Sequence, residues 1–277
     1  MNLYDETCLK CSKIITRKYS TSFSLGIKTF HKRFRYPIYA IYGFVRFADE
    51  IVDTFHDKNK QELLARFRKE TFLAIEEKIS LNPVLQSFQK IVNEYAIDLG
   101  LIDAFLRSME MDLDKTTYTD ESYKDYIYGS AEVIGLMCLK VFSEGNEALY
   151  HPLVPKARSL GSAFQKINFL RDIKSDFDER GRTYFPLVDF LEFTEVQKQE
   201  IEEDIRADFE DALEGIKALP KGCKLGVYIA YLYYIKLFDK IKSTPAQIIS
   251  ERRIRISDSQ KMYLMAQAML KDKMNMV

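Results

Sequence analysis

The sequence predicts an all-α fold, and three observations carry that prediction. Apolar residues recur at the three-to-four-residue spacing of amphipathic helices along most of the chain. Glycine and proline are sparse, at 11 and 7 of 277 residues, whereas a β-sandwich or barrel needs many turn residues. No run reaches the roughly 18 apolar residues of a transmembrane helix, and the longest candidate is 225–235. We expect one soluble all-α domain over residues 1–277.

The helical periodicity places the individual elements in order. Helices are expected over 3–18, 35–56, 59–79, 84–98, 101–115, 120–143, 147–178, 189–216, 220–242 and 245–272. Asn82-Pro83 begins one of them, because proline suits the first turn. Thr119 is a candidate N-cap for another. Gly145 and Gly181 separate further helices.

Composition excludes several classes of function. Lys+Arg and Asp+Glu both total 41, so the chain has no net charge and we expect no nucleic-acid partner. No glycine-rich phosphate-binding motif is present. The N-terminus lacks the apolar core of a secretion signal, and four cysteines do not form a disulfide framework. These features favour a cytoplasmic location.

Two of the expected helices carry acidic residues on a face that should be buried. In the segment 38–55, one stripe about 60° wide holds Tyr42, Arg46, Asp49 and Asp53. In the segment 161–178, one stripe holds Gln165, Asn168, Asp172 and Asp176. The other faces of both helices are largely apolar, so we expect the polar stripes to point inward.

Buried carboxylates of like charge repel one another and are costly to desolvate unless a cation compensates them. A pair four residues apart places two carboxylates on one helix face, where they can bind Mg²⁺. Arg46 and Arg171 lie within a turn of the acids and could pair with them or bind an anion. Spacing alone leaves two interpretations open: a Mg²⁺ site that captures a diphosphate, or core helices neutralised by salt bridges.

Several blocks along almost the whole chain resemble the squalene/phytoene synthase family of head-to-head prenyl transferases. The blocks are Ser20-Thr21-Ser22-Phe23, AIYGFVRFADEIVD (40–53), YIYGSAEVIGLM (126–137), AFQKINFLRDIKSDFDERGRTYFP (163–186), and Tyr234 with the run from Arg253. Thr21 stands where the family commonly has a basic residue, and Glu132 where it commonly has glycine. The resemblance implies an isoprenoid-synthase-type helical bundle around a central apolar cavity.

The resemblance also assigns roles to the quoted residues. It implies Mg²⁺, or alternatively Mn²⁺, held by Asp49, Asp53, Asn168, Asp172 and Asp176. It implies substrate contacts from Ser20, Ser22, Tyr42, Arg46, Gln165, Asn168, Arg171, Tyr234 and Arg253. The four aspartates and Tyr126 are the implied catalytic residues, and either Tyr126 or the departing diphosphate would accept the proton.

Within the family, MEMDLDKTTY (109–118) followed by the Tyr126 block is most similar to phytoene synthases, which join two geranylgeranyl diphosphates. NADPH is not expected for that reaction. Two alternatives remain: a C30 dehydrosqualene or squalene synthase that uses farnesyl diphosphate, and a catalytically inactive all-α isoprenoid-binding or scaffold protein. Loose contact with a membrane surface is a further hypothesis, although no basic amphipathic helix supports it. The sequence does not determine the oligomeric state.

Overall fold

The computed structural model describes residues 2–114, 117–186, 188, 193–251 and 253–274, apart from the side chains of 21, 22, 179 and 180. This part of the chain is helical and confirms the all-α prediction. The elements are α1 (Leu3–Tyr19), α2 (Thr21–Thr29), α3 (Lys32–Asp53), α4 (Lys60–Glu77), α5 (Pro83–Tyr95), α6 (Leu99–Asp114), α7 (Asp120–Ile127), the π-helical turn η1 (Tyr128–Glu132), α8 (Val133–Ser143), α9 (Glu147–Arg180), α10 (Glu195–Ala218), α11 (Lys221–Lys242), α12 (Ala246–Glu251) and α13 (Asp258–Lys273).

Two predicted helices need correction, and one helix was not predicted. Helix α2 was not expected, and it begins because the Ser20 hydroxyl accepts a hydrogen bond from the backbone N–H of Phe23 (3.2 Å). The helix predicted over 189–216 has its described start at Glu195, where Thr194 forms a capping box; residues 189–192 lie outside the described part. The helix predicted over 245–272 is two helices, because Ser257 caps a new one, α13.

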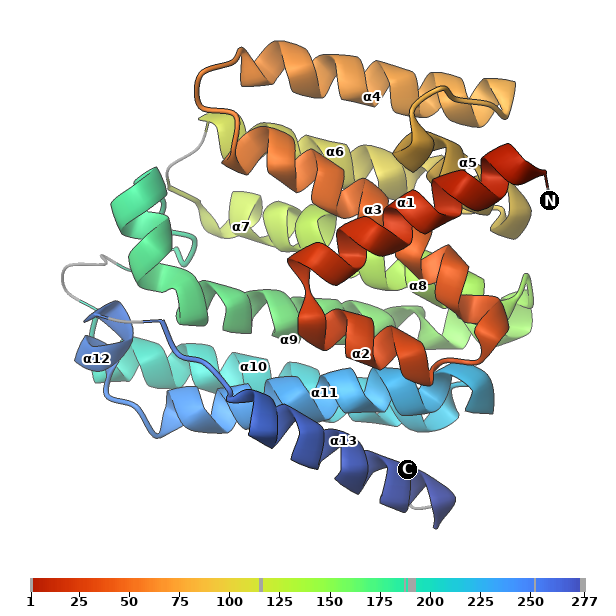
Figure 1. Cartoon of the computed structure of the whole chain (residues 1–277). Helices are drawn as coiled ribbons and strands as arrows, with labels where there is room; N and C mark the ends of the chain where they lie inside the picture. Colours follow the sequence, from red (N-terminus) through yellow and green to blue (C-terminus); the bar gives the residue numbers. More distant parts are fainter. Residues whose placement is uncertain (1, 115–116, 187, 189–192, 252, 275–277) are drawn as a thin grey trace.

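Helix α9 lies at the centre of the molecule. It packs against α8 and η1 on one side and against α10, α11 and α12 on the other. Figure 1 shows it (green) crossing between the N-terminal helices and the layer of α10, α11 and α13. One buried apolar cluster is built mainly from α3, α5, α6 and α8, and a second from α9, α10 and α11. The acidic stripes of α3 and α9 therefore lie on helices from the two halves of the core.

Glycines allow the helices around η1 to approach closely. A Cβ added to Gly129 would lie 2.5 Å from the carbonyl oxygen of Ala104 in α6. A Cβ added to Gly161 would lie 2.9 Å from the carbonyl oxygen of Ala131. Contacts this short are repulsive, so α6, η1 and α9 can pack as they do only because these positions carry no side chain.

The helical stretch Asp120–Ser143 is long and apolar enough, by length and composition alone, to cross a membrane. The longest apolar candidate expected from the sequence was a different segment, 225–235. In the structure, 61% of the apolar window in Asp120–Ser143 is buried inside the protein. Its apolar residues, such as Val133 and Met137, belong to the core.

We predict that Gly129→Ala destabilises the protein by about 1–3 kcal/mol, because the new methyl group overlaps the α6 backbone. Gly26→Ala is the matched control, because its nearest neighbour would lie at an ordinary 3.7 Å. The control should stay within about 1 kcal/mol of the wild type. Urea denaturation followed by circular dichroism measures both free energies of unfolding, and equal values for the two variants would contradict the packing argument.

Candidate active site

The four aspartates of the two acidic stripes line one polar cavity of about 260 Å³. Asp49 and Asp53 reach it from α3, whereas Asp172 and Asp176 reach it from α9. The remaining polar lining comprises Asp112, Tyr126, Ser130, Gln165, Asn168, Arg171, Arg182 and Tyr184. The inward orientation that the helical periodicity predicted is confirmed for both pairs.

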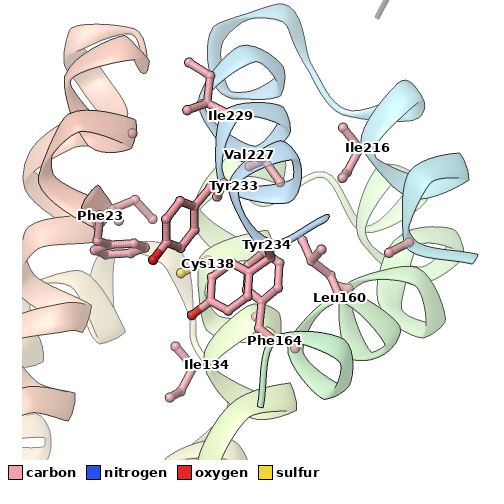
Figure 2. A pocket seen from close by; sticks show the side chains of 18 of the residues that line it. Phe23, Ile134, Cys138, Leu160, Phe164, Ile216, Val227, Ile229, Tyr233 and Tyr234 are labelled. Atoms are coloured by element: carbon pink, nitrogen blue, oxygen red, sulfur yellow. The ribbon is translucent and has the colours of Figure 1, made fainter. Parts of the chain in front are cut away.

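A second cavity, of about 430 Å³, is predominantly apolar and lies beside the polar one. Figure 2 shows its aromatic and aliphatic wall, including Phe164 and Tyr234, whose rings stack with centroids 3.9 Å apart. Ser130, Gln165, Asn168 and Arg171 line both cavities. A charged headgroup and an apolar tail could therefore occupy adjoining spaces, with these four residues at the junction.

Arginines neutralise part of the acidic charge. Arg171 makes two hydrogen bonds to Asp172, at 3.0 and 2.5 Å. Arg253, in the segment between α12 and α13, reaches the same carboxylate at 2.7 Å. Arg46 binds Glu50 at 2.7 Å and lies 3.7 Å from Asp49. The two interpretations of the stripes are thus compatible, because the same acids both form ion pairs and line a cavity.

Asp49 shows that the negative charge is not fully compensated. Burial raises the pKa of Asp49 to about 7; Arg46 opposes this shift, while the carboxylates of Asp53 and Asp112 add to it. Within the described residues, no three Asp, Glu, His or Cys side chains already converge as a metal site. The donors are nevertheless carboxylate and amide oxygens around one cavity, which is the ligand chemistry that Mg²⁺ prefers. These residues therefore fit a hard divalent cation.

A buried Asp112–Arg182 pair lines the same polar cavity and was not among the predicted site residues. The two side chains are 6% and 9% exposed, and their nearest charged atoms are 3.2 Å apart. Arg182 also donates to the backbone carbonyl of Asp112 and to the Tyr184 hydroxyl (3.3 Å). The sequence carried one signal for Asp112. It follows the apolar Met109 by three residues on an expected helix, so both side chains lie on the same inward face.

Tyr126 is held by this pair. Its hydroxyl donates to Asp112 at 2.9 Å, and its ring packs against those of Tyr118 and Tyr184. Burial and the Asp112 carboxylate raise the pKa of Tyr126 well above its ordinary value. Tyr126 is therefore a neutral phenol that donates its proton to Asp112, and both side chains line the polar cavity.

The other predicted substrate-binding residues fall into two groups. Tyr234 donates to Asn168 (3.1 Å), Asn168 donates to Gln165 (3.4 Å), and Gln165 donates to Ser130 (3.1 Å). These residues therefore form a connected network at the junction of the cavities. Ser20 also lines the apolar cavity. Three others, Arg46, Arg253 and Tyr42, line neither cavity. Arg46 lies over the Tyr19 ring, Arg253 binds Asp172, and Tyr42 stacks on Phe23. The side chain of Ser22 lies outside the described part.

We predict that Asp112→Asn lowers the free energy of unfolding by about 3 kcal/mol, because it leaves Arg182 as a buried cation without its counter-ion. Arg182→Gln should cost a similar amount. The double variant should lose clearly less than the sum of the two single losses, because it removes both charges together. Urea denaturation of the four proteins measures this coupling, and strictly additive losses would contradict it.

The comparisons with known proteins agree with this architecture. The family model described as squalene/phytoene synthase matches residues 16–260. A phytoene synthase from Arthrospira platensis is 27% identical over 86% of this chain and 85% of its own. A 4,4'-diapophytoene synthase from Staphylococcus haemolyticus is 26% identical over 75% of this chain and 72% of its own. The crystal structure of a dehydrosqualene synthase shares the fold with a TM-score of 0.80, at 21% identity over 97% of this chain and 98% of that one. With a match over most of its length, the chain belongs to the squalene/phytoene synthase family.

Proposed function

We propose that this protein is a magnesium-dependent phytoene synthase, which condenses two geranylgeranyl diphosphates head to head. One observation carries the proposal: an acid-lined cavity adjoins an apolar one through four shared residues. That arrangement suits a substrate with a diphosphate at one end and a long hydrocarbon at the other. The matches to phytoene synthases over most of the chain support the choice of substrate.

Asp49, Asp53, Asn168, Asp172 and Asp176 would hold Mg²⁺. When bound, Mg²⁺ would offset the negative charge that develops on the leaving diphosphate. Arg171 and Arg253 already bind Asp172, and their guanidinium groups can instead donate to phosphate oxygens when substrate is present. The arginines would thus exchange a carboxylate partner for a diphosphate.

The proposed reaction has two halves. One substrate first releases its diphosphate, which leaves an allylic cation. The double bond nearest the diphosphate of the second substrate then attacks this cation. Loss of a proton closes the ring of a cyclopropyl diphosphate. This intermediate then loses its diphosphate and rearranges, and loss of a second proton forms the central double bond. These two half-reactions need no reductant, so NADPH has no part in the proposed reaction. The apolar cavity would exclude water, and the stacked rings of Phe164 and Tyr234 present π-faces that suit a carbocation.

Tyr126 is the proposed proton acceptor. Its hydroxyl donates its own proton to Asp112, which leaves oxygen lone pairs to accept another. A proton taken up on the Tyr126 oxygen can be balanced by transfer of the original phenolic proton to the Asp112 carboxylate. Tyr126 would then return to its neutral form, which is consistent with a pKa far above the ordinary value.

A second candidate function is C30 synthesis from two farnesyl diphosphates. The match to a 4,4'-diapophytoene synthase and the fold shared with a dehydrosqualene synthase favour it. Both candidates use the same polar cavity, and they differ in the length of hydrocarbon that the apolar cavity must hold.

We expect purified protein with Mg²⁺ and geranylgeranyl diphosphate to form a C40 phytoene, identified by mass spectrometry of the hydrocarbon extract. Farnesyl diphosphate should react more slowly, because the shorter tail fills less of the apolar cavity. A C30 product formed preferentially from mixed substrates would support the alternative. No hydrocarbon from either substrate, from a folded protein, would contradict both candidates.

We predict that Asp172→Asn lowers kcat/KM by about 100-fold or more, because it removes a charge from the polar cavity. Asp178→Asn is the matched control on the same helix, because Asp178 is exposed and bound to Lys174. It should keep activity near the wild-type level, and both variants should show the wild-type circular dichroism spectrum. An active Asp172→Asn variant, or equal losses in the two, would contradict the assignment.

A further inference from the structure

The π-helical turn η1 carries a serine whose hydroxyl makes hydrogen bonds in two directions. Ser130 donates to the backbone carbonyl of Tyr126 (2.7 Å) and accepts from the side-chain amide of Gln165 in α9 (3.1 Å). It also lines both cavities. π-Helical turns inside α-helices occur frequently at functional sites. Ser130 was not predicted as a site residue, and no step of the proposed reaction uses it.

Two further contacts hold η1 against α9. Gly161 lies one turn before Gln165, and a Cβ on it would come within 2.9 Å of a backbone carbonyl oxygen of η1. Arg158, about one turn earlier still, makes an ion pair with Glu132 at 2.5 Å. The Glu132 side chain is only 13% exposed, so the pair is partly shielded from solvent. The packing of two helices therefore sets the contact between Ser130 and Gln165.

One proton fixes the direction of a longer chain of hydrogen bonds. The Ser130 hydroxyl has a single proton, and a backbone carbonyl can only accept, so this proton is committed to Tyr126. Ser130 can then only accept from Gln165, which must present its Nε2 group. The Gln165 Oε1 atom is left to accept from Asn168 Nδ2 (3.4 Å). The Asn168 amide must therefore turn its nitrogen towards Gln165 and its oxygen to the other side.

The far end of the chain does not impose this direction by itself. Tyr234 donates to the Asn168 oxygen (3.1 Å), but a phenol can also accept, so it would tolerate the flipped amide. The two orientations of an amide differ only in the exchange of O and NH2, and the neighbouring groups decide between them. Ser130 is thus the member of the chain whose bond to a backbone carbonyl removes the choice.

We infer that Ser130 is a positioning residue, which acts through Gln165 to hold the Asn168 amide with its oxygen available to a divalent cation. The inference rests on the proposed function, in which Asn168 is a Mg²⁺ ligand. A carbonyl oxygen has two lone pairs, and Tyr234 occupies one of them, so the other can bind Mg²⁺. A flipped Asn168 would offer an NH2 group, which cannot bind a cation. Groups that orient a ligand through hydrogen bonds change metal affinity by about 10–100-fold.

Titration calorimetry with inorganic diphosphate at a series of Mg²⁺ concentrations tests the inference. Ser130→Ala should raise the Mg²⁺ concentration for half-maximal diphosphate binding by about tenfold, because Gln165 and Asn168 lose their fixed orientation. Ser130→Thr should stay within about twofold of the wild type, since threonine also bonds to the carbonyl four residues earlier. The matched control is Ser250→Ala, which removes a hydroxyl bond of the same kind, to Ala246 at 3.2 Å, from a residue that lines neither cavity. It should titrate like the wild type.

Melting temperature and activity separate the outcomes. Each variant should unfold within about 4 °C of the wild type, so that weaker binding does not reflect lost structure. In the synthase assay, more Mg²⁺ should recover most of the kcat of Ser130→Ala, because the orientation of a ligand has been lost and not a catalytic group.

Several results would overturn the positioning role and leave the proposed function standing. They are an unchanged Mg²⁺ dependence in Ser130→Ala, binding by Ser130→Thr as weak as that by Ser130→Ala, and weaker binding that accompanies a clearly lower melting temperature. A loss of kcat that Mg²⁺ does not recover would also overturn it. Mg²⁺-dependent binding that Ser130→Ala weakens, in a protein that forms no hydrocarbon, would instead overturn the proposed reaction and leave the positioning role standing.

Discussion

Carboxylates from α3 and α9 face one cavity, and the surrounding structure depends on making that concentration of negative charge tolerable. Arg171 and Arg253 bind Asp172, Arg46 binds Glu50, and Arg182 binds Asp112 in the same cavity. Each guanidinium offsets part of the desolvation cost of a buried or half-buried acid. At Asp49, burial and the neighbouring carboxylates of Asp53 and Asp112 raise the pKa to about 7 in spite of Arg46. A divalent cation with a diphosphate is the partner that we propose for this group of acids.

Packing places the charged cavity beside the apolar one. The contacts of α9 with both halves of the core fix Asp172 and Asp176 opposite α3. The same helix contributes Phe164 and Leu160 to the apolar wall, about two to four turns before these aspartates. A single helix therefore changes from apolar to acidic along its length. Gly161 brings α9 close enough to η1 for Gln165 and Ser130 to meet at the junction, and Gly129 lets η1 pack against α6.

Periodicity predicted the all-α fold and the inward direction of both acidic stripes, because a buried stripe repeats along a helix. It failed where local capping decides the structure: Ser20 begins α2 and Ser257 begins α13, and a serine side chain is a weak signal beside apolar spacing. It also missed Asp112 and Arg182, which are far apart in sequence and meet only in the folded protein.

The central claim is that the acids of α3 and α9 act together to bind a cation and a diphosphate. Calorimetric titration of the protein with inorganic diphosphate, with and without Mg²⁺, tests it directly. The account predicts binding that requires Mg²⁺ and is lost in both Asp53→Asn and Asp176→Asn, one substitution from each helix. Diphosphate binding of equal strength without Mg²⁺, or binding that survives either substitution, would contradict it.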